Sequence, residues 1–206
     1  SHQTIYGCTY NLLTGFLKRF GVETDFVDLK NPENAARAMR PNTRVIYTES
    51  PVNPNLELTD IGALRAIADK ANARRKKDDR PVRVLVDNTF ATPYGQRPLK
   101  LGAHMVIHSL TKNIGGFGTD MGGAVITSRD MEGQLLIWRK DFGGALASRA
   151  AWPILVYGVP TIPLRVSRQT KSAMQIAAWL EQRPEVKRVS YPGLSSFAQR
   201  ELALKQ

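Results

Sequence analysis

Segments with strand character alternate with segments of helix character along most of the chain, and this alternation limits the possible folds more than any other feature. Apolar, β-branched runs predict strands at 22–29, 44–49, 82–87, 104–109 and 123–128. Helical spacing of apolar residues and capping signals predict helices at 10–20, from 31 onward, at 60–77 and at 161–182. Alternating strands and helices predict an α/β fold, with a mostly parallel sheet and flanking helices.

Local signals mark where several of these helices begin and end. Gly21 follows the first helix, and Asn31 and Pro32 are an N-cap and a first helical residue at the start of the second. Asp60 is expected to cap the third helix. The apolar residues of this helix lie on one face, and they are Ile61, Leu64, Ile67 and Ala68.

The chain is basic, with 29 Lys and Arg against 18 Asp and Glu and a formal net charge of +11. Such a charge raises the alternative of a non-enzymatic α/β module that binds nucleic acid. Much of the excess lies in the run 74–77, which two aspartates follow at once. No aromatic residues are interleaved with this run, as a base-stacking surface would require. The pattern favours a solvated helix end, and nucleic-acid binding remains the minor alternative.

Composition and cysteine content exclude several other classes of protein. Apolar residues make up 42% of the chain and charged residues 23%, which is typical of a globular protein. The single cysteine, Cys8, cannot form an internal disulfide, so a reducing, cytoplasmic compartment is expected. No run approaches the ~18 apolar residues that a membrane-spanning helix needs. No spacing of His, Cys, Asp and Glu predicts a metal site.

Three of the predicted strands end in polar residues, which are Glu49, Asp87 and Ser109. In open parallel sheets, ligands bind beyond the carboxyl ends of the strands. A carboxylate at a strand end, such as Asp87, can pair with a protonated pyridine nitrogen and strengthen a cofactor as an electron sink. These strand ends are therefore the predicted place of the chemistry.

The segment 106–116 joins an apolar strand to two hydroxyls, one lysine and two glycines. Apolar neighbours are expected to remove Lys112 from water, which would free its amine to form a Schiff base with an aldehyde cofactor. Ser109 and Thr111 can donate hydrogen bonds to a phosphate, and glycines allow the backbone to approach it closely. By itself, the segment fits a strand and turn with an exposed lysine and a capping aspartate slightly better.

Taken together, the motifs of this chain resemble the pyridoxal-phosphate (PLP) enzymes of cysteine and methionine metabolism. That family includes methionine γ-lyase, cystathionine γ-synthase and γ-lyase, and O-acylhomoserine sulfhydrylase. The resemblance covers essentially the whole chain, and the motifs fall in the order that the family has. The matching segments are 6–9 (Tyr-Gly-Cys-Thr), 49–54 (Glu-Ser-Pro-Val-Asn-Pro), 86–94 (Val-Asp-Asn-Thr-Phe-Ala-Thr-Pro-Tyr), 96–98 (Gln-Arg-Pro), 108–112 (His-Ser-Leu-Thr-Lys) and 191–194 (Tyr-Pro-Gly-Leu).

The resemblance implies a role for each matching residue. Lys112 would hold pyridoxal 5'-phosphate and move the substrate's α proton. Asp87 would pair with the pyridine nitrogen, and Ser109 and Thr111 would bind the phosphate. Tyr6 would stack on the cofactor ring and assist proton transfer at the leaving group. The two remaining cofactor-binding residues are Asn53, expected at the ring oxygen, and Glu49, expected near it.

The same residues serve elimination and replacement, so they do not choose between the two reactions. γ-Elimination on methionine or cystathionine would give a 2-oxo acid, ammonia and a thiol. γ-Replacement on an O-acylhomoserine would be catalysed by an O-acetylhomoserine sulfhydrylase or a cystathionine γ-synthase. We expect elimination, with replacement as the alternative.

Two features favour a γ-lyase and two favour a sulfhydrylase. Cys8 resembles the cysteine typical of methionine γ-lyases, and Lys140 with Asp141 resembles a Lys-Asp segment of the same enzymes; a structural explanation of Cys8 is a small buried apolar residue. Residues 10–12 and 114–119 resemble the sulfhydrylases, with Phe117 where their pattern has histidine.

Members of this family are about twice as long as this chain. The resemblance therefore implies a large PLP-binding domain of fold type I at 1–155, incomplete at its N-terminal side. Residues 156–206 would hold an interdomain helix and the start of a C-terminal α+β domain, including a strand at 186–191. The full-length protein is expected to be a homo-oligomer, a dimer of dimers, that acts on a small sulfur amino acid or an activated homoserine. The 206-residue chain alone is expected to bind the cofactor weakly and to turn over little substrate.

Overall fold

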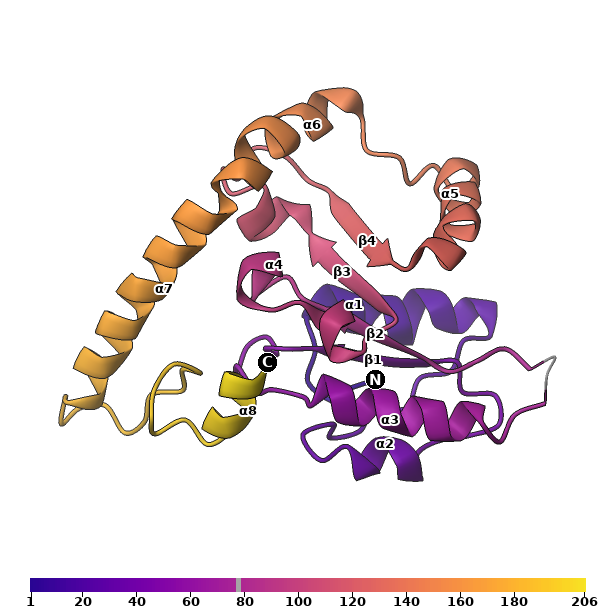
Figure 1. Ribbon diagram of the computed structural model, residues 1–206, viewed down its shortest axis with the longest axis horizontal. Helices are drawn as coiled ribbons and strands as arrows, with labels where there is room; N and C mark the ends of the chain where they lie inside the picture. The colour runs from indigo at the N-terminus through magenta and orange to yellow at the C-terminus, as the bar shows by residue number, and fades with distance from the viewer. Residues whose placement is uncertain (77–78) are drawn as a thin grey trace.

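A computed structural model describes residues 1–76 and 79–206, and its described strands form one open sheet. The strands are β1 (Val45–Glu49), β2 (Arg83–Asp87), β3 (Met105–Ser109) and β4 (Gly123–Thr127), in that order across the sheet. The first three strands are parallel, and β4 runs antiparallel to β3. The predicted fold class, an α/β fold with a mostly parallel sheet and flanking helices, is confirmed (Figure 1).

Apart from the end of the third helix, the helices begin and end close to the predicted signals. The first helix starts at Gly7, earlier than expected, continues through Leu12–Phe16 and Leu17–Phe20, and ends at Gly21, whose φ of 75° is left-handed. The side chain of Asp60 caps the third helix by accepting a hydrogen bond from the Ala63 N–H at 2.9 Å. The helices are α1 (Gly7–Asn11), α2 (Glu33–Arg37), α3 (Ile61–Asn72), α4 (Thr92–Gly95), α5 (Glu132–Asp141), α6 (Ser148–Pro153), α7 (Val159–Glu181) and α8 (Arg200–Lys205).

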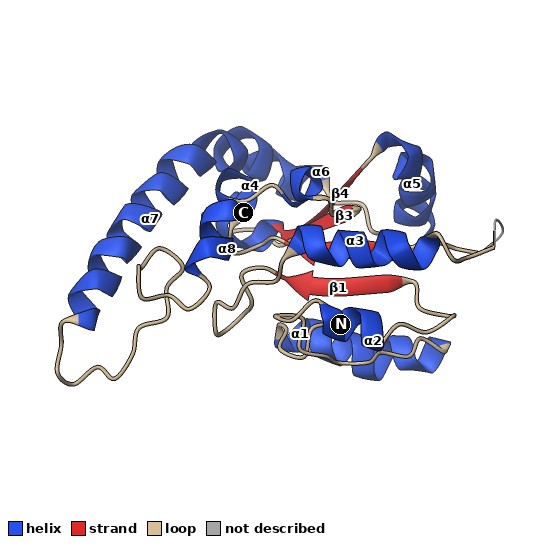
Figure 2. Ribbon diagram, turned by 60° about the horizontal axis from the view of Figure 1, so that its bottom comes forward, coloured by secondary structure: helices blue, strands red, loops and turns tan. Residues whose placement is uncertain are grey.

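The main core lies between the sheet and the pair of helices α2 and α3. Leu64 on α3 is fully buried, and it belongs to the same apolar cluster as Val84 of β2 and Val106 of β3. Burial of such side chains provides much of the free energy that holds a helix against a sheet. Both views place α1 and α3 on opposite sides of β1 (Figures 1 and 2). The sheet is therefore covered on the α3 side by the core, and its other side faces the start of α1.

The strand expected at 22–29 is wrong. This fully described segment forms one isolated bridge, between Val27 and His2, instead of a strand. The His2 N–H donates to the Tyr47 carbonyl of β1 at 2.9 Å, so residues 1–3 lie between β1 and the segment 22–29. Three residues are too short a partner to support a full strand, because a strand needs a continuous ladder of backbone hydrogen bonds.

The third helix is shorter than predicted. α3 ends at Asn72, and Lys77, the predicted end, lies outside the described residues together with the adjacent Asp78. The Asn72 side chain accepts from the Val82 N–H at 2.7 Å and donates to the Val82 carbonyl at 3.0 Å. This pairing ties the end of α3 to the approach to β2, so residues 73–76 belong to the connection rather than to the helix.

The long helix expected at 161–182 is confirmed as α7, but the strand expected at 186–191 is wrong. α7 extends away from the sheet, and the chain then turns back without forming a strand in this described segment (Figure 1). The returning segment docks on the loop before α3 instead. Gln199 exchanges two hydrogen bonds with the backbone of Leu58, at 2.8 and 2.7 Å, and Lys205 lies 3.0 Å from Asp60.

The division of the chain into domains at residue 155 remains a prediction. Within the part of the chain that the structure describes, no helix is long and apolar enough to cross a membrane.

Candidate active site

The carboxyl ends of the three parallel strands bring together the polar residues predicted there. Glu49 and Asp87 are partners in the register of β1 and β2, and Asp87 is aligned with Ile107 of β3. Registered residues of parallel strands point to the same face, and residues two apart on one strand share a face. Glu49, Asp87 and Ser109 therefore lie on one face at one edge of the sheet.

Glu49 joins this edge to two separate loops. Its Oε1 accepts a hydrogen bond from the Tyr6 N–H at 2.7 Å, and its Oε2 accepts one from the Asn53 N–H at 3.2 Å. The side chain is buried, and burial raises its pKa while the two N–H donors oppose that rise. The structure thus places Tyr6 and Asn53, two residues expected to contact a cofactor, on the same carboxylate.

Asp87 is connected to Ser109 through a residue that sequence reasoning did not single out. Asp87 Oδ1 accepts a hydrogen bond from the Thr89 N–H at 2.9 Å, and Thr89 Oγ1 accepts one from the Ser109 N–H at 2.9 Å. Thr89 lies inside a motif that the sequence already marks, and its position two residues after a strand-end aspartate is the available signal. The chain Asp87–Thr89–Ser109 fixes the loop after β2 against the end of β3.

Tyr47 is a second site residue that the sequence does not reveal. It lies two residues before Glu49, on the same face of β1, and it is buried. Burial raises the pKa of its phenol well above the ordinary value, and the nearby charges of Asp87 and Glu49 add to that rise. Tyr47 therefore stays protonated beneath the two carboxylates.

The segment that carries Lys112 forms a tight turn, residues 110–116, which we call the lysine turn. The Leu110 N–H donates to the Gly122 carbonyl at 2.9 Å, and Thr111 Oγ1 accepts from the Gly122 N–H at 3.2 Å. Because Thr111 Oγ1 already accepts a hydrogen bond, its hydroxyl proton stays free to donate to an anion. Lys112 itself is exposed, so of the two interpretations of this segment the strand and turn with an exposed lysine is the one found, and apolar neighbours do not remove its amine from water.

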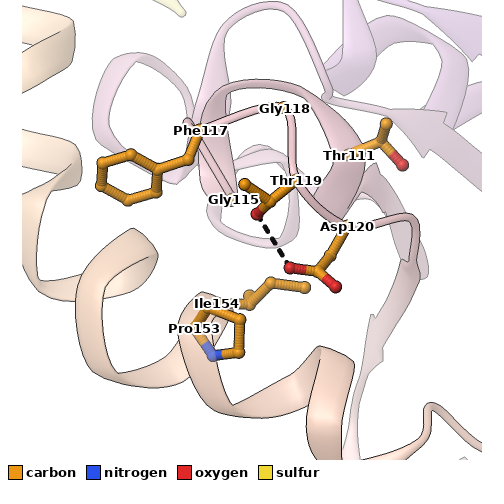
Figure 3. Close-up of a pocket in the computed structure, with 8 residues that line it drawn as sticks. All are labelled: Thr111, Gly115, Phe117, Gly118, Thr119, Asp120, Pro153 and Ile154. Carbon is orange, nitrogen blue, oxygen red and sulfur yellow. Dashed lines mark hydrogen bonds between the residues drawn. The ribbon is translucent and has the colours of Figure 1, made fainter.

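A small pocket lies beside the lysine turn, between residues 115–120 and the junction of α6 with the turn that follows it (Figure 3). Thr119 Oγ1 donates to Asp120 Oδ2 at 2.8 Å inside it, and Pro153 with Ile154 forms its apolar wall. The Phe117 ring points away from Thr111 in this view (Figure 3). Thr111 and Phe117 both line this pocket, and their side chains point in different directions.

Buried amide side chains support the loop between β2 and α4. Asn88 is fully buried, donates to the carbonyls of Thr92 and Gln96 at 3.1 and 2.9 Å, and accepts from Gln96 Nε2 at 3.0 Å. Gln96 Nε2 also donates to the Ser50 carbonyl at 2.8 Å. This network joins the residues that follow β1 to those that follow β2, so it holds the positions of Glu49 and Asp87 relative to each other.

The two features that resemble a γ-lyase are placed differently. Cys8 is exposed one residue into α1, so its interpretation as a small buried residue is wrong; its thiol raises the pKa of Tyr6. Lys140 and Asp141 form an exposed ion pair at 3.2 Å on α5. Because β4 runs antiparallel to β3, α5 begins at the sheet end opposite to the lysine turn (Figure 1). The structure therefore brings Cys8 beside Tyr6 but does not bring α5 to that group.

The chain matches the family model described as "Cys/Met metabolism PLP-dependent enzyme" over residues 1–206. The chain belongs to this family. It is 42% identical over 205 residues to the L-methionine gamma-lyase of Fusobacterium nucleatum subsp. polymorphum, and this alignment covers 99% of this chain and 50% of that protein. It is 41% identical over 203 residues to the cystathionine gamma-lyase of Bacillus subtilis, which covers 98% of this chain and 51% of that protein.

Solved structures agree with this assignment. The crystal structure of metB from Corynebacterium glutamicum superimposes with a TM-score of 0.91 and 37% identity, covering all of this chain and 51% of that one. Cystathionine gamma-lyase from Lactobacillus plantarum, complexed with L-serine, gives 0.91 and 32% over the same shares. The chain therefore spans about half the length of the relatives it matches. The family is enzymatic and depends on pyridoxal phosphate.

The groups at the strand ends fit that cofactor chemically. A carboxylate suits a protonated ring nitrogen, an exposed amine suits an aldehyde, and two hydroxyls suit a phosphate. Asp87, Lys112, Ser109 and Thr111 offer this set within one connected edge. Among the described residues, no cluster of three or more His, Cys, Asp or Glu side chains could hold a metal ion.

Replacing Asn88 with Ala is expected to lower the free energy of unfolding by about 2 to 4 kcal/mol, because the buried Gln96 carbonyl loses its side-chain donor and Gln96 Nε2 loses one acceptor, while the Thr92 carbonyl keeps only the Gln96 N–H. Urea denaturation followed by circular dichroism measures this change. Asn11→Ala, at an exposed helical position, is the matched control and should change the value by less than about 0.5 kcal/mol. Equal effects of the two substitutions would show that the network does not stabilise the loop.

His108 gives a pH prediction. Burial lowers its pKa below the ordinary 6.5. Below that pH the unfolded chain binds the proton more readily than the folded chain, so the stability contributed by His108 falls as the pH drops from 6.5 toward the folded pKa. The free energy of unfolding can fall by up to about 1.4 kcal/mol per pH unit in this range. Urea titrations between pH 5 and 7.5 should show a shallower loss in His108→Asn than in the wild type, and parallel curves would contradict the assignment.

Proposed function

We propose that the protein catalyses PLP-dependent γ-elimination on a sulfur amino acid such as methionine or cystathionine, releasing a 2-oxo acid, ammonia and a thiol. The observation that supports this most is the hydrogen-bonded group of residues at the carboxyl ends of the strands, which we call the connected edge. There Glu49 binds the backbone of Tyr6 and Asn53, and Asp87 is joined through Thr89 to Ser109, just before the lysine turn. The similarity to proteins named L-methionine gamma-lyase and cystathionine gamma-lyase favours the same reaction.

Each residue of this edge has a task in the proposed reaction. Pyridoxal phosphate, when bound, supplies an electron sink that makes the protons next to the substrate amine acidic. Asp87 keeps the ring nitrogen protonated, and Asn53 orients the ring through its polar side chain. Ser109 and Thr111 donate hydrogen bonds to the phosphate. Lys112 holds the cofactor before substrate arrives and then takes the α proton.

In this proposal, Tyr6 gives a proton to the leaving sulfur. A tyrosine phenol is protonated at neutral pH and can therefore act as an acid; the adjacent thiol of Cys8 raises the pKa of Tyr6, which keeps the phenol in this form. The Glu49 carboxylate fixes the Tyr6 backbone at 2.7 Å, while the ring is 44% exposed. An anchored backbone with an exposed ring suits a residue that must reach substrate. Cys8 thereby contributes to the site through Tyr6.

γ-Replacement on an O-acylhomoserine is the second candidate. The segments 10–12 and 114–119 favour it, and so does 39% identity over 202 residues to a probable cystathionine gamma-synthase of Herpetosiphon aurantiacus. In replacement, a thiol would bond to the γ carbon that has lost its substituent, whereas in elimination water would release ammonia at the α carbon and give the 2-oxo acid. The same groups would move the protons in both reactions. The difference therefore depends on access of a second substrate to the edge.

Self-assembly belongs to the same proposal. Large apolar side chains remain exposed on the chain, among them Phe20 at 70%, Met121 at 80% and Phe142 at 85%. Exposed apolar side chains of this size are typical of surfaces that further protein covers. We propose that the active protein is a homo-oligomer in which these surfaces are buried.

The role of Lys112 is tested by cofactor binding to the full-length protein. Wild-type protein should show a visible absorption band of the bound cofactor, and Lys112→Ala should lose it, because the covalent attachment is gone. Lys100→Ala, an exposed lysine outside the edge, is the matched control and should keep the band. An unchanged band in the Lys112 variant would refute the assignment.

The reaction is tested by product analysis with the full-length protein. Methionine and cystathionine should each yield a 2-oxo acid, detected with a hydrazine reagent. O-acetylhomoserine with sulfide should yield far less homocysteine, because we propose elimination as the main reaction. Homocysteine formation that depends on sulfide, without 2-oxo acid from methionine, would establish replacement instead.

A further inference from the structure

Arg165, on α7, reaches across to the lysine turn and binds its backbone. Its Nη1 donates to the Asn113 carbonyl at 2.7 Å, and its Nη2 donates to the carbonyls of Gly158 and Ile114 at 2.9 and 3.3 Å. Its Nε donates to Thr161 Oγ1 at 2.9 Å, within α7 itself. One guanidinium therefore joins the two residues after Lys112 to the start of a helix about 50 residues further along the chain.

The lysine turn requires such a donor because its backbone is irregular. Lys112 has φ −90° and ψ −133°, which is not helical, while its neighbours form helix-like hydrogen bonds. The Gly115 N–H donates to the Leu110 carbonyl, and the Gly116 N–H donates to the Lys112 carbonyl, each at 2.8 Å. The carbonyls of Asn113 and Ile114 need donors from outside the turn, since unpaired buried backbone groups are costly. Arg165 provides these donors.

Two glycines make room for this contact. Gly116 has φ +79°, and a Cβ there would lie 2.4 Å from the Arg165 Cζ. A Cβ at Gly158 would lie 2.5 Å from the Ile114 carbonyl oxygen. Any side chain at either position would force the turn and the guanidinium apart. The glycines therefore permit the approach of α7 to the backbone beside Lys112.

Phe117 completes the surroundings of the guanidinium. The Arg165 Cζ lies 5.7 Å from the centroid of the Phe117 ring. A cation over an aromatic face is attracted by the ring's quadrupole. Phe117, which stands where the sulfhydrylase pattern has histidine, thus adds an attraction that holds Arg165 over the turn.

We propose that Arg165 is a positioning residue for Lys112, fixing the backbone of the lysine turn so that the amine is presented at the strand ends. The inference rests on the proposed function only in taking Lys112 as the amine that receives the cofactor. Arg165 acts through the backbone, and its planar fork of donors, rather than its charge alone, determines the geometry.

The test compares Arg165 with Arg168, an exposed arginine on the same helix. R165Q removes the fork and the charge, R165K keeps only the charge, and R168Q and R168K are the matched controls. Two quantities are measured on full-length protein from which the cofactor has been removed. One is backbone hydrogen exchange at residues 113–118, followed by mass spectrometry. The other is the rate at which pyridoxal phosphate, fixed by borohydride, labels Lys112 in peptide maps.

R165Q should speed exchange at 113–118 about tenfold and slow labelling of Lys112 by a similar factor, because charge-assisted hydrogen bonds are lost. R165K should recover part of both effects, and the Arg168 variants should remain near the wild type. Wild-type exchange and labelling in R165Q would overturn the proposal, as would equal changes in R168Q.

Two further measurements separate the possible failures. If R165Q does not fold, as judged by circular dichroism, R165K decides: wild-type exchange at 113–118 in the folded R165K protein overturns the proposal. Lys112→Ala should abolish labelling of this peptide. Persistent labelling in that variant would refute the role of Lys112 in the proposed function, whereas the exchange data would still decide whether Arg165 fixes the turn.

Discussion

The carboxylate of Glu49 is buried at the end of β1 and binds two backbone N–H groups from separate loops, and the rest of the site depends on this interaction. A buried carboxylate is costly unless it is hydrogen-bonded, and here each oxygen has a backbone donor. Burial raises the pKa of Glu49 by more than the two N–H donors lower it. The buried carboxylate therefore lies at the position where it can bind the backbone of both Tyr6 and Asn53.

The parallel register extends this arrangement across the sheet. Glu49 and Asp87 are aligned, and Thr89 carries the hydrogen bonding from Asp87 to Ser109. Each link is a bond to backbone, so the geometry depends on where the strands end more than on side-chain packing. The network around Asn88 also fixes the ends of β1 and β2 relative to each other, because it joins the residues following β1 to those following β2.

Sequence reasoning predicts the parts of this structure that are set by local patterns. Apolar runs locate the four strands that the structure describes, and caps such as Asp60 locate helix starts, because these signals act within a few residues. Sequence reasoning fails where a strand depends on a partner strand far along the chain. The segments 22–29 and 186–191 have strand-like patterns, but neither meets a partner long enough to form a ladder of backbone hydrogen bonds. Apolar neighbours in sequence also leave Lys112 exposed, because they need not cover a residue at the tip of a turn.

The contacts that no local pattern reveals are those made across the fold. Tyr47 gains its significance from two carboxylates, one of them on another strand, and Arg165 from a turn about 50 residues earlier. The helical spacing places Arg165 beside the buried Ile162 and Val166, but nothing in the sequence shows that its side chain binds the backbone of the lysine turn. The contact arises when Gly116 and Gly158 let α7 approach the lysine turn closely. The lysine is therefore held from two sides, by the sheet through Gly122 and by α7 through Arg165.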